Sequence, residues 1–158
     1  MTREAFINQV EDTQEALRRF LGVLCRGDAA RADDIAQEAY VKAYLASDTL
    51  GDESRFRPWL YRIAYNTFVS SARTERLTDD VDVAVALPSG QRADASFEYQ
   101  ELYVALERLS EKERTAILLY YMEGYQTDEI AVITGMSADA VRQQLSRGRA
   151  HLREILKR

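Results

Sequence analysis

The chain has 158 residues and a formal net charge of −5, with 46% apolar and 30% charged residues. This balance is typical of a soluble folded protein, and it argues against a basic chain that coats nucleic acid without sequence preference. Cys25 is the only cysteine and His151 is the only histidine, which excludes an internal disulfide framework, a cysteine-rich zinc site and catalytic sites that need several histidines. We expect Cys25, next to an apolar run, to be a buried thiol, and we expect no metal site and no cofactor.

Residues 1–76 carry apolar side chains at helical spacing in three segments. The spacing predicts a first helix from Ala5 to about Leu24 and a second from Arg31 to Ala46. A third helix is predicted from near Pro58, which suits a first helical turn, towards Arg73. Residues 47–52 have the composition of a loop.

Residues 77–98 carry five acidic side chains and one basic one, and they include Pro88, Ser89 and Gly90. This composition indicates an acidic flexible linker between two helical modules. The nineteen residues from Leu77 to Ala95, if extended, could span about 60 Å. A weak alternation from Val81 to Leu87 leaves a short strand as an alternative, although no partner strand is visible.

Residues 99–158 form the second predicted module. Ser110 followed by Glu113 is a capping-box start for a helix that ends near Gly124. Two short helices are then predicted around Gly135, followed by a basic tail helix to Arg158. The predicted fold is therefore all-α, with two small helical modules.

Residues 127–146 have the spacing of a helix-turn-helix. Ile130 and Ile133 face inward, Gly135 supplies the tight turn, and Val141 and Leu145 anchor the second helix. The positions left facing outward are Ser137, Ala138, Asp139, Arg142, Gln143 and Ser146. In a major groove, arginine can pair with guanine and glutamine with adenine.

The end of this module is strongly basic. Residues 142–158 hold six basic side chains and a single acid, Glu154. Such a segment can neutralise DNA phosphates. A basic helix C-terminus also complements the helix dipole, so this signal alone does not settle DNA binding.

Aromatic and basic residues alternate over residues 56–66. Exposed aromatic rings can stack on unpaired bases while arginines hold the backbone. Phe56 and Trp59 fit a core better than a stacking surface, whereas we expect Tyr61, Arg62 and Tyr65 to be exposed. This segment indicates contact with single-stranded nucleic acid.

Two motifs resemble those of the extracytoplasmic-function (ECF) sigma factors of bacterial RNA polymerase. Residues 32–40, ADDIAQEAY, are similar to the A-E-D-x-x-Q-E-x-F of that family's region 2. Residues 56–66 match its F-x-x-W-L-x-x-I-A-x-N. Leu106, Leu109, Arg114 and residues 129–147 resemble region 4. The resemblance covers residues 6–76 and 99–158 and implies a transcription initiation factor.

The resemblance also implies a division of labour. A sigma region 2-like domain, residues 1–76, would bind the β′ clamp of core polymerase through Asp34, Gln37, Glu38 and Val41. The same domain would open and recognise the −10 promoter element as a single strand, using residues 47–55 and the helix that follows. Its implied DNA contacts are Trp59, Tyr61, Arg62, Tyr65, Asn66 and Arg73.

A sigma region 4-like domain, residues 99–158, would recognise the −35 element as duplex DNA and bind the β flap. Its implied contacts are the outward positions given above together with Arg147 and Arg149. An anti-sigma factor is a further implied partner. The chain departs from the family pattern at Tyr65 and Ser70, which makes the region 2 face less charged than usual.

Two other classes of function fit the sequence less well. A helix-turn-helix regulator that ignores polymerase would not need the aromatic helix at residues 59–66, and a helical adaptor would not need the basic residues at 142–158. An enzyme is not expected, because one histidine, one cysteine and no Gly-rich phosphate loop leave only carboxylates. No apolar stretch reaches the roughly 18 residues of a membrane span, so we expect a cytoplasmic protein without membrane insertion.

Overall fold

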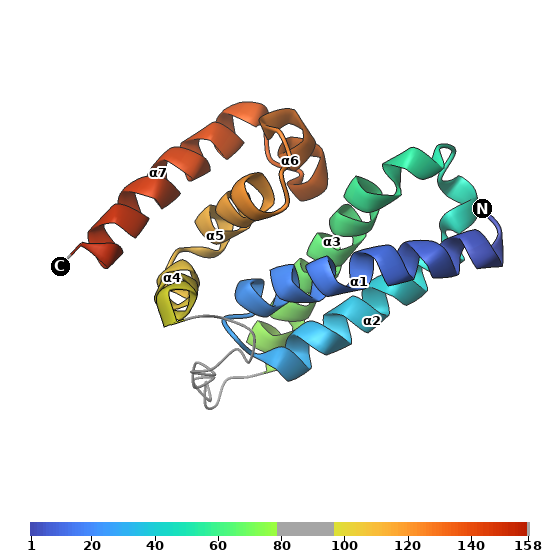
Figure 1. Cartoon of the computed structure of the whole chain (residues 1–158), viewed down its shortest axis with the longest axis horizontal. Coiled ribbons are helices and arrows are strands. Elements are labelled where there is room, and N and C mark those ends of the chain that lie inside the picture. Colours follow the sequence, from blue (N-terminus) through green and yellow to red (C-terminus); the bar gives the residue numbers. More distant parts are fainter. Residues whose placement is uncertain (79–96, 158) are drawn as a thin grey trace.

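A computed structural model describes residues 1–78 and 97–157, and the side chains of residues 1–73 and 100–157. All regular structure in these residues is helical, as the sequence predicted, and the described part of the chain holds no strand. Helices α1–α3 lie on one side of the molecule and α4–α7 on the other (Figure 1).

Three long helices build the first module: α1 (Arg3–Leu24), α2 (Ala29–Leu45) and α3 (Phe56–Thr78). The Thr2 and Asp28 side chains start α1 and α2 by accepting backbone N–H bonds of 3.1 Å each. Helix α2 packs against both α1 and α3. All three helices match predicted segments, with ends that differ by a few residues.

The connection between α2 and α3 contains two short 3₁₀ helices, η1 (Ser47–Thr49) and η2 (Glu53–Arg55), where the sequence indicated a loop. Asp52 precedes the second one and accepts a bond from the Ser54 backbone N–H at 3.0 Å. Helix α3 begins at Phe56 rather than near Pro58, and the Phe56 ring is buried in the core at the helix start.

The second module contains α4 (Phe97–Glu107), α5 (Glu111–Ile117), a π-helical turn η3 (Leu118–Met122), α6 (Thr127–Thr134) and α7 (Ala138–Leu156). The predicted capping box at Ser110 is present. The prediction of a short second helix followed by a separate tail helix was wrong. Both are parts of the single helix α7, because nothing in residues 138–156 breaks the helical backbone.

The predicted linker at residues 77–98 meets a described helix at each end. Helix α3 continues through Thr78 and α4 begins at Phe97. The rest of that segment, including the alternative strand from Val81 to Leu87, lies outside the described residues.

The two modules pack against each other. Helix α3 contacts α6, and α1 contacts α4 and α5. Their buried apolar residues form one continuous cluster. The buried guanidinium of Arg114 joins the modules by donating to the Leu109 carbonyl at 2.8 Å and to the Leu24 carbonyl, at the end of α1, at 3.1 Å. This packing places the helix-turn-helix beside α3.

Candidate nucleic-acid and protein interfaces

The helix-turn-helix consists of α6, the turn at Gly135 and the first half of α7. Gly135 has φ 80°, a left-handed conformation that glycine adopts without a steric penalty. Ser137 caps α7 by accepting the Ala140 backbone N–H at 3.1 Å. Ile130 and Ile133 from α6, and Val141 and Leu145 from α7, are buried as predicted.

The opposite face of α7 is open to solvent. Of the outward positions predicted from the sequence, only Ala138 is half-buried, and the others are exposed. Arg142 pairs with Asp139 one turn earlier on the same helix, which holds its guanidinium on this face. Arg149 donates to the Tyr121 hydroxyl at 3.2 Å, and Arg147, two residues earlier, is also exposed.

Helix α2 presents an acidic face. Asp34, Gln37, Glu38 and Val41 are all exposed, and their spacing of three, one and three residues keeps them on one side of the helix. The Val41 side chain is among the exposed large apolar residues, at 58%. Glu38 also pairs with Lys42 at 3.2 Å.

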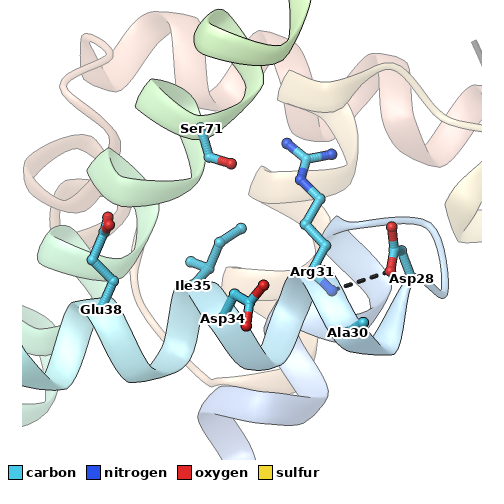
Figure 2. Close-up of a pocket in the computed structure, with 7 residues that line it drawn as sticks. All are labelled: Asp28, Ala30, Arg31, Asp34, Ile35, Glu38 and Ser71. Carbon is cyan, nitrogen blue, oxygen red and sulfur yellow. Dashed lines mark hydrogen bonds between the residues drawn. The ribbon is translucent and has the colours of Figure 1, made fainter.

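An open pocket of about 280 Å³ lies between this face and α3 (Figure 2). Asp28, Asp34 and Glu38 supply three carboxylates around it, and Ile35 supplies an apolar wall. The guanidinium of Arg31 lies 5.3 Å from the centre of the Phe68 ring. The remaining lining residues are Ala30 and Ser71.

The third predicted surface, on α3, is split between two faces of the helix. Arg62, Asn66 and Arg73 are exposed, and Trp59 is half-buried. Tyr61 and Tyr65 were expected to be exposed, and that expectation was wrong, because their exposed fractions are 0% and 6%. These two tyrosines face the second module, which the sequence pattern of α3 by itself does not reveal.

Aromatic packing explains the burial of Tyr61. Its ring makes edge contacts with Phe20 of α1 and with Tyr125 of the second module, at centroid distances of 5.2 and 5.6 Å. Its hydroxyl donates to Glu123 Oε1 at 2.5 Å. Burial raises the pKa values of both Tyr61 and Glu123. For Tyr65, burial likewise raises the hydroxyl pKa, and the nearby Glu111 adds to the shift.

Three residues of the contact between the modules were missed by sequence reasoning: Arg114 as a link to α1, Glu123 and Tyr125. Burial, with a contribution from Arg26, lowers the pKa of Arg114 to about 10. Nothing in the local pattern marks Glu123 or Tyr125, because their partners lie about sixty residues away in the chain.

Other expectations concern single residues. Cys25 is buried as expected. His151 bonds through Nδ1 to the largely buried carboxylate of Glu113, at 2.9–3.0 Å. Among the described residues there is no group of three side chains suited to a metal ion, and no helix is both long and apolar enough to cross a membrane.

Family comparisons assign both modules. A model of sigma-70 region 2 matches residues 10–78, and a model of sigma-70 region 4 matches residues 99–152. The first covers α2 and α3, and the second covers the helix-turn-helix. The order of the two matches agrees with the resemblance noted in the sequence.

Relatives that are similar to this chain are named as RNA polymerase sigma factors. Probable RNA polymerase sigma factor RfaY of Xanthomonas campestris pv. campestris is 37% identical to this chain over 142 residues. The match covers 83% of this chain but only 36% of the length of RfaY. The ECF RNA polymerase sigma factor EcfG of Rhodopseudomonas palustris is 31% identical over 144 residues, covering 89% of this chain and 79% of the relative.

A solved structure extends the likeness to the fold. The sigma factor RpoE from Bartonella quintana, in complex with the anti-sigma factor NepR, superposes with a TM-score of 0.83. It shares 29% identity, and the match covers 96% of each chain. On these matches and on its paired regions 2 and 4, the chain belongs to the ECF sigma factors of bacterial RNA polymerase.

Proposed function

We propose that this chain binds core polymerase mainly through α2 and positions promoter DNA with α3 and α7. We assign residues 1–76 to core binding and to the −10 element, and residues 99–158 to the −35 element, with residues 77–98 joining them. The site of action is the cytoplasm, where polymerase and promoter meet.

The observation that best supports core-polymerase binding is the exposed face of α2. Asp34, Gln37, Glu38 and Val41 combine two carboxylates, an amide and an apolar side chain on one helix face. A partner that buries this face gains apolar area at Val41 and needs basic groups opposite the carboxylates. We assign that partner as the β′ clamp of the polymerase.

The exposed side of α3 suits single-stranded DNA. Arg62 and Arg73 can hold phosphates, Asn66 can hydrogen-bond a base edge, and Trp59 offers part of a ring for stacking. Tyr61 and Tyr65 contribute to −10 recognition only in a chain whose modules have separated, since both are buried in the closed arrangement.

Helix α7 suits duplex DNA. Its first turns present Arg142 and Gln143, which have the donor geometry for guanine and adenine in the major groove. Arg147 and Arg149 follow on the exposed part of the helix and fit phosphate contacts. We assign this surface to the −35 element, and the rest of the module to the β flap.

An anti-sigma factor is the proposed regulator. RpoE, which is similar to this chain over nearly its whole length, was crystallised with the anti-sigma factor NepR. A protein of that kind would compete with core polymerase for the same exposed helix faces.

The test is a pull-down and a run-off transcription assay with bacterial core polymerase. We expect the chain to bind core and to give discrete, promoter-dependent transcripts. Glu38→Ala should weaken core binding about tenfold and leave duplex binding unchanged. Glu15→Ala, which removes an exposed acid on α1, should leave both core binding and duplex binding unchanged. Duplex binding without any core binding would instead support the regulator alternative.

A further inference from the structure

The turn that follows α5 presents an exposed tyrosine beside α7. At η3 the backbone widens into a π-helical turn, in which the Glu123 N–H bonds to the Leu118 carbonyl, five residues earlier, at 3.1 Å. Such turns are rare, and they occur frequently at functional sites. Leu118 and Leu119 of this turn are buried in the core, whereas Tyr121 has 56% of its surface exposed. An exposed aromatic side chain on a widened turn is a candidate for contact with a ligand.

The Tyr121 side chain is held against α7. Arg149 Nη1 donates to its hydroxyl at 3.2 Å, and the ring of Tyr120 packs edge-on against its ring at a centroid distance of 4.9 Å. The hydroxyl is the acceptor in this bond, and among the described residues no acceptor takes its own proton. The bond also occupies only one of the five N–H donors of the guanidinium. Two helical segments therefore bring several available donors to one exposed place.

The partner of Arg149 leaves the charge of this arginine uncompensated. Arg142, farther towards the start of α7, pairs with the carboxylate of Asp139. Arg149 bonds instead to a neutral hydroxyl, and in the described part of the chain it pairs with no acid. A carboxylate would both orient the guanidinium and cancel much of its charge, whereas a hydroxyl orients it and leaves the charge in place. This arrangement suits an anion that comes from outside the chain.

The position along α7 indicates which anion that is. Arg142 and Arg149 are seven residues apart, so they lie on the same side of the helix and about 10 Å apart along its axis. The major groove of DNA is about 12 Å wide, and phosphates border it. When Arg142 lies at the base edges, Arg149 and Tyr121 are at the border of the groove. The anion within their reach is a phosphate of the DNA backbone.

From these observations we propose that Tyr121 and Arg149 together bind one phosphate of the −35 duplex. We call these two side chains the phosphate pair. The Tyr121 hydroxyl orients the Arg149 guanidinium and donates its own proton to a phosphate oxygen, so η3 takes part in DNA binding. Phosphate contacts fix how a protein lies on the duplex without reading its sequence, and the pair therefore positions α7 for the base contacts of Arg142. The inference rests on the proposed function of α7.

The test measures binding of the full chain to the preferred −35 duplex, identified from the run-off transcripts, and to a random duplex. Tyr121→Phe removes only a hydroxyl and should weaken both complexes about fivefold, the loss expected for one hydrogen bond. The slope of log K against log salt should stay the same, because no charge is removed. Arg149→Ala should reduce that slope by about 0.9. Tyr44→Phe, which removes a hydroxyl from an exposed side chain of α2, is the matched control and should bind both duplexes like the wild type.

A double variant tests whether the two side chains act together. Tyr121→Phe combined with Arg149→Ala should lose less affinity than the product of the two single losses, because each side chain helps to place the other. Losses that multiply fully would overturn the joint binding, and wild-type affinity in Tyr121→Phe would overturn the role of the tyrosine. A loss confined to the preferred duplex would overturn the phosphate assignment. A wild-type chain that bound neither duplex would overturn the proposed function of α7 and, with it, the phosphate pair.

Discussion

Helices α3 and α7 are both long helices assigned to DNA, and they differ in where their packing partners lie: those of α7 all belong to its own module, whereas α3 also packs on the other module. The buried residues of α7 are Val141, Leu145 and Gly148, and the half-buried Leu152 and Ile155 continue the same packed side, so the opposite side of the helix is available to a partner. Helix α3 packs on α2 and also on α6. Its buried residues accordingly form two adjoining stripes, and two predicted DNA contacts lie in the second.

The difference shows what a motif can establish about a helix. A motif fixes which residues are present, whereas exposure depends on every element that packs on the helix. For α7 the packing partners α4, α5 and α6 belong to the same module, and the pattern of residues 127–146 already indicates which face of the helix packs on them. For α3 one packing partner, α6, belongs to the other module, so the local sequence pattern of α3 does not indicate it.

The largest expected effect tests the burial of Tyr61. Replacing it by alanine removes a fully buried ring and leaves Glu123 without its donor, so Tyr61→Ala should lower the free energy of unfolding by about 3–5 kcal/mol. Arg62→Ala, next to it but exposed, should change it by less than about 0.5 kcal/mol. Urea unfolding followed by circular dichroism gives both values, and similar small losses would show that Tyr61 is not a core residue in solution.

The second expected effect concerns the exposed side of α7. Arg142→Ala combined with Gln143→Ala should weaken binding to the preferred −35 duplex by about 1–3 kcal/mol, which is roughly 5- to 150-fold. Binding to a random duplex should fall much less, because base contacts and not phosphate contacts are lost. Fluorescence anisotropy with both duplexes measures the difference, and equal losses would contradict base recognition by this face.

The third expected effect separates phosphate contacts from base contacts on the same helix. Arg147→Ala should weaken preferred and random duplexes alike, and should reduce the slope of log K against log salt by about 0.9. Glu154→Ala, an exposed acid farther along α7, is the matched control and should leave the slope the same or slightly steeper. A slope that Arg147→Ala leaves unchanged would place this arginine outside the DNA contact.

Sequence reasoning recovered most of the fold for identifiable physical reasons. The start of α5 was marked by a side chain that acts locally, Ser110, and buried stripes were marked by periodicity. The role of Gly148 could not be predicted: a Cβ there would lie 2.8 Å from Ile117 Cγ1, a clash that depends on how closely α5 and α7 approach. The burial of Tyr61 and Tyr65 escaped prediction for the same reason, since each depends on contact between distant segments.

The smallest expected effect concerns two glutamates, each of which links two helices. Their contributions to the stability of the fold change with pH in opposite directions. At Glu113, burial would raise the carboxyl pKa, but hydrogen bonds from His151 and Ser110 outweigh it and lower the pKa below its usual 4.5. Its stabilising contribution is therefore present above about pH 4.5 and is lost as the pH falls through the lowered value. At Glu123 the effect of burial outweighs the hydrogen bond from Tyr61, and the carboxyl pKa is raised. The stabilising contribution of Glu123 is therefore present below about pH 4.5 and is lost as the pH rises through the raised value.

Urea unfolding between pH 3 and pH 8 should resolve the two glutamates. Glu113→Gln should lessen the fall in stability on the acid side, and Glu123→Gln should lessen the fall on the neutral side, because each variant removes one titrating carboxyl. If both variants changed the acid side alone, Glu123 would be ionised without cost in the folded chain. The contact between α3 and the second module would then carry no electrostatic cost at this carboxylate, and its pH response would be no different from that of the contact between α5 and α7.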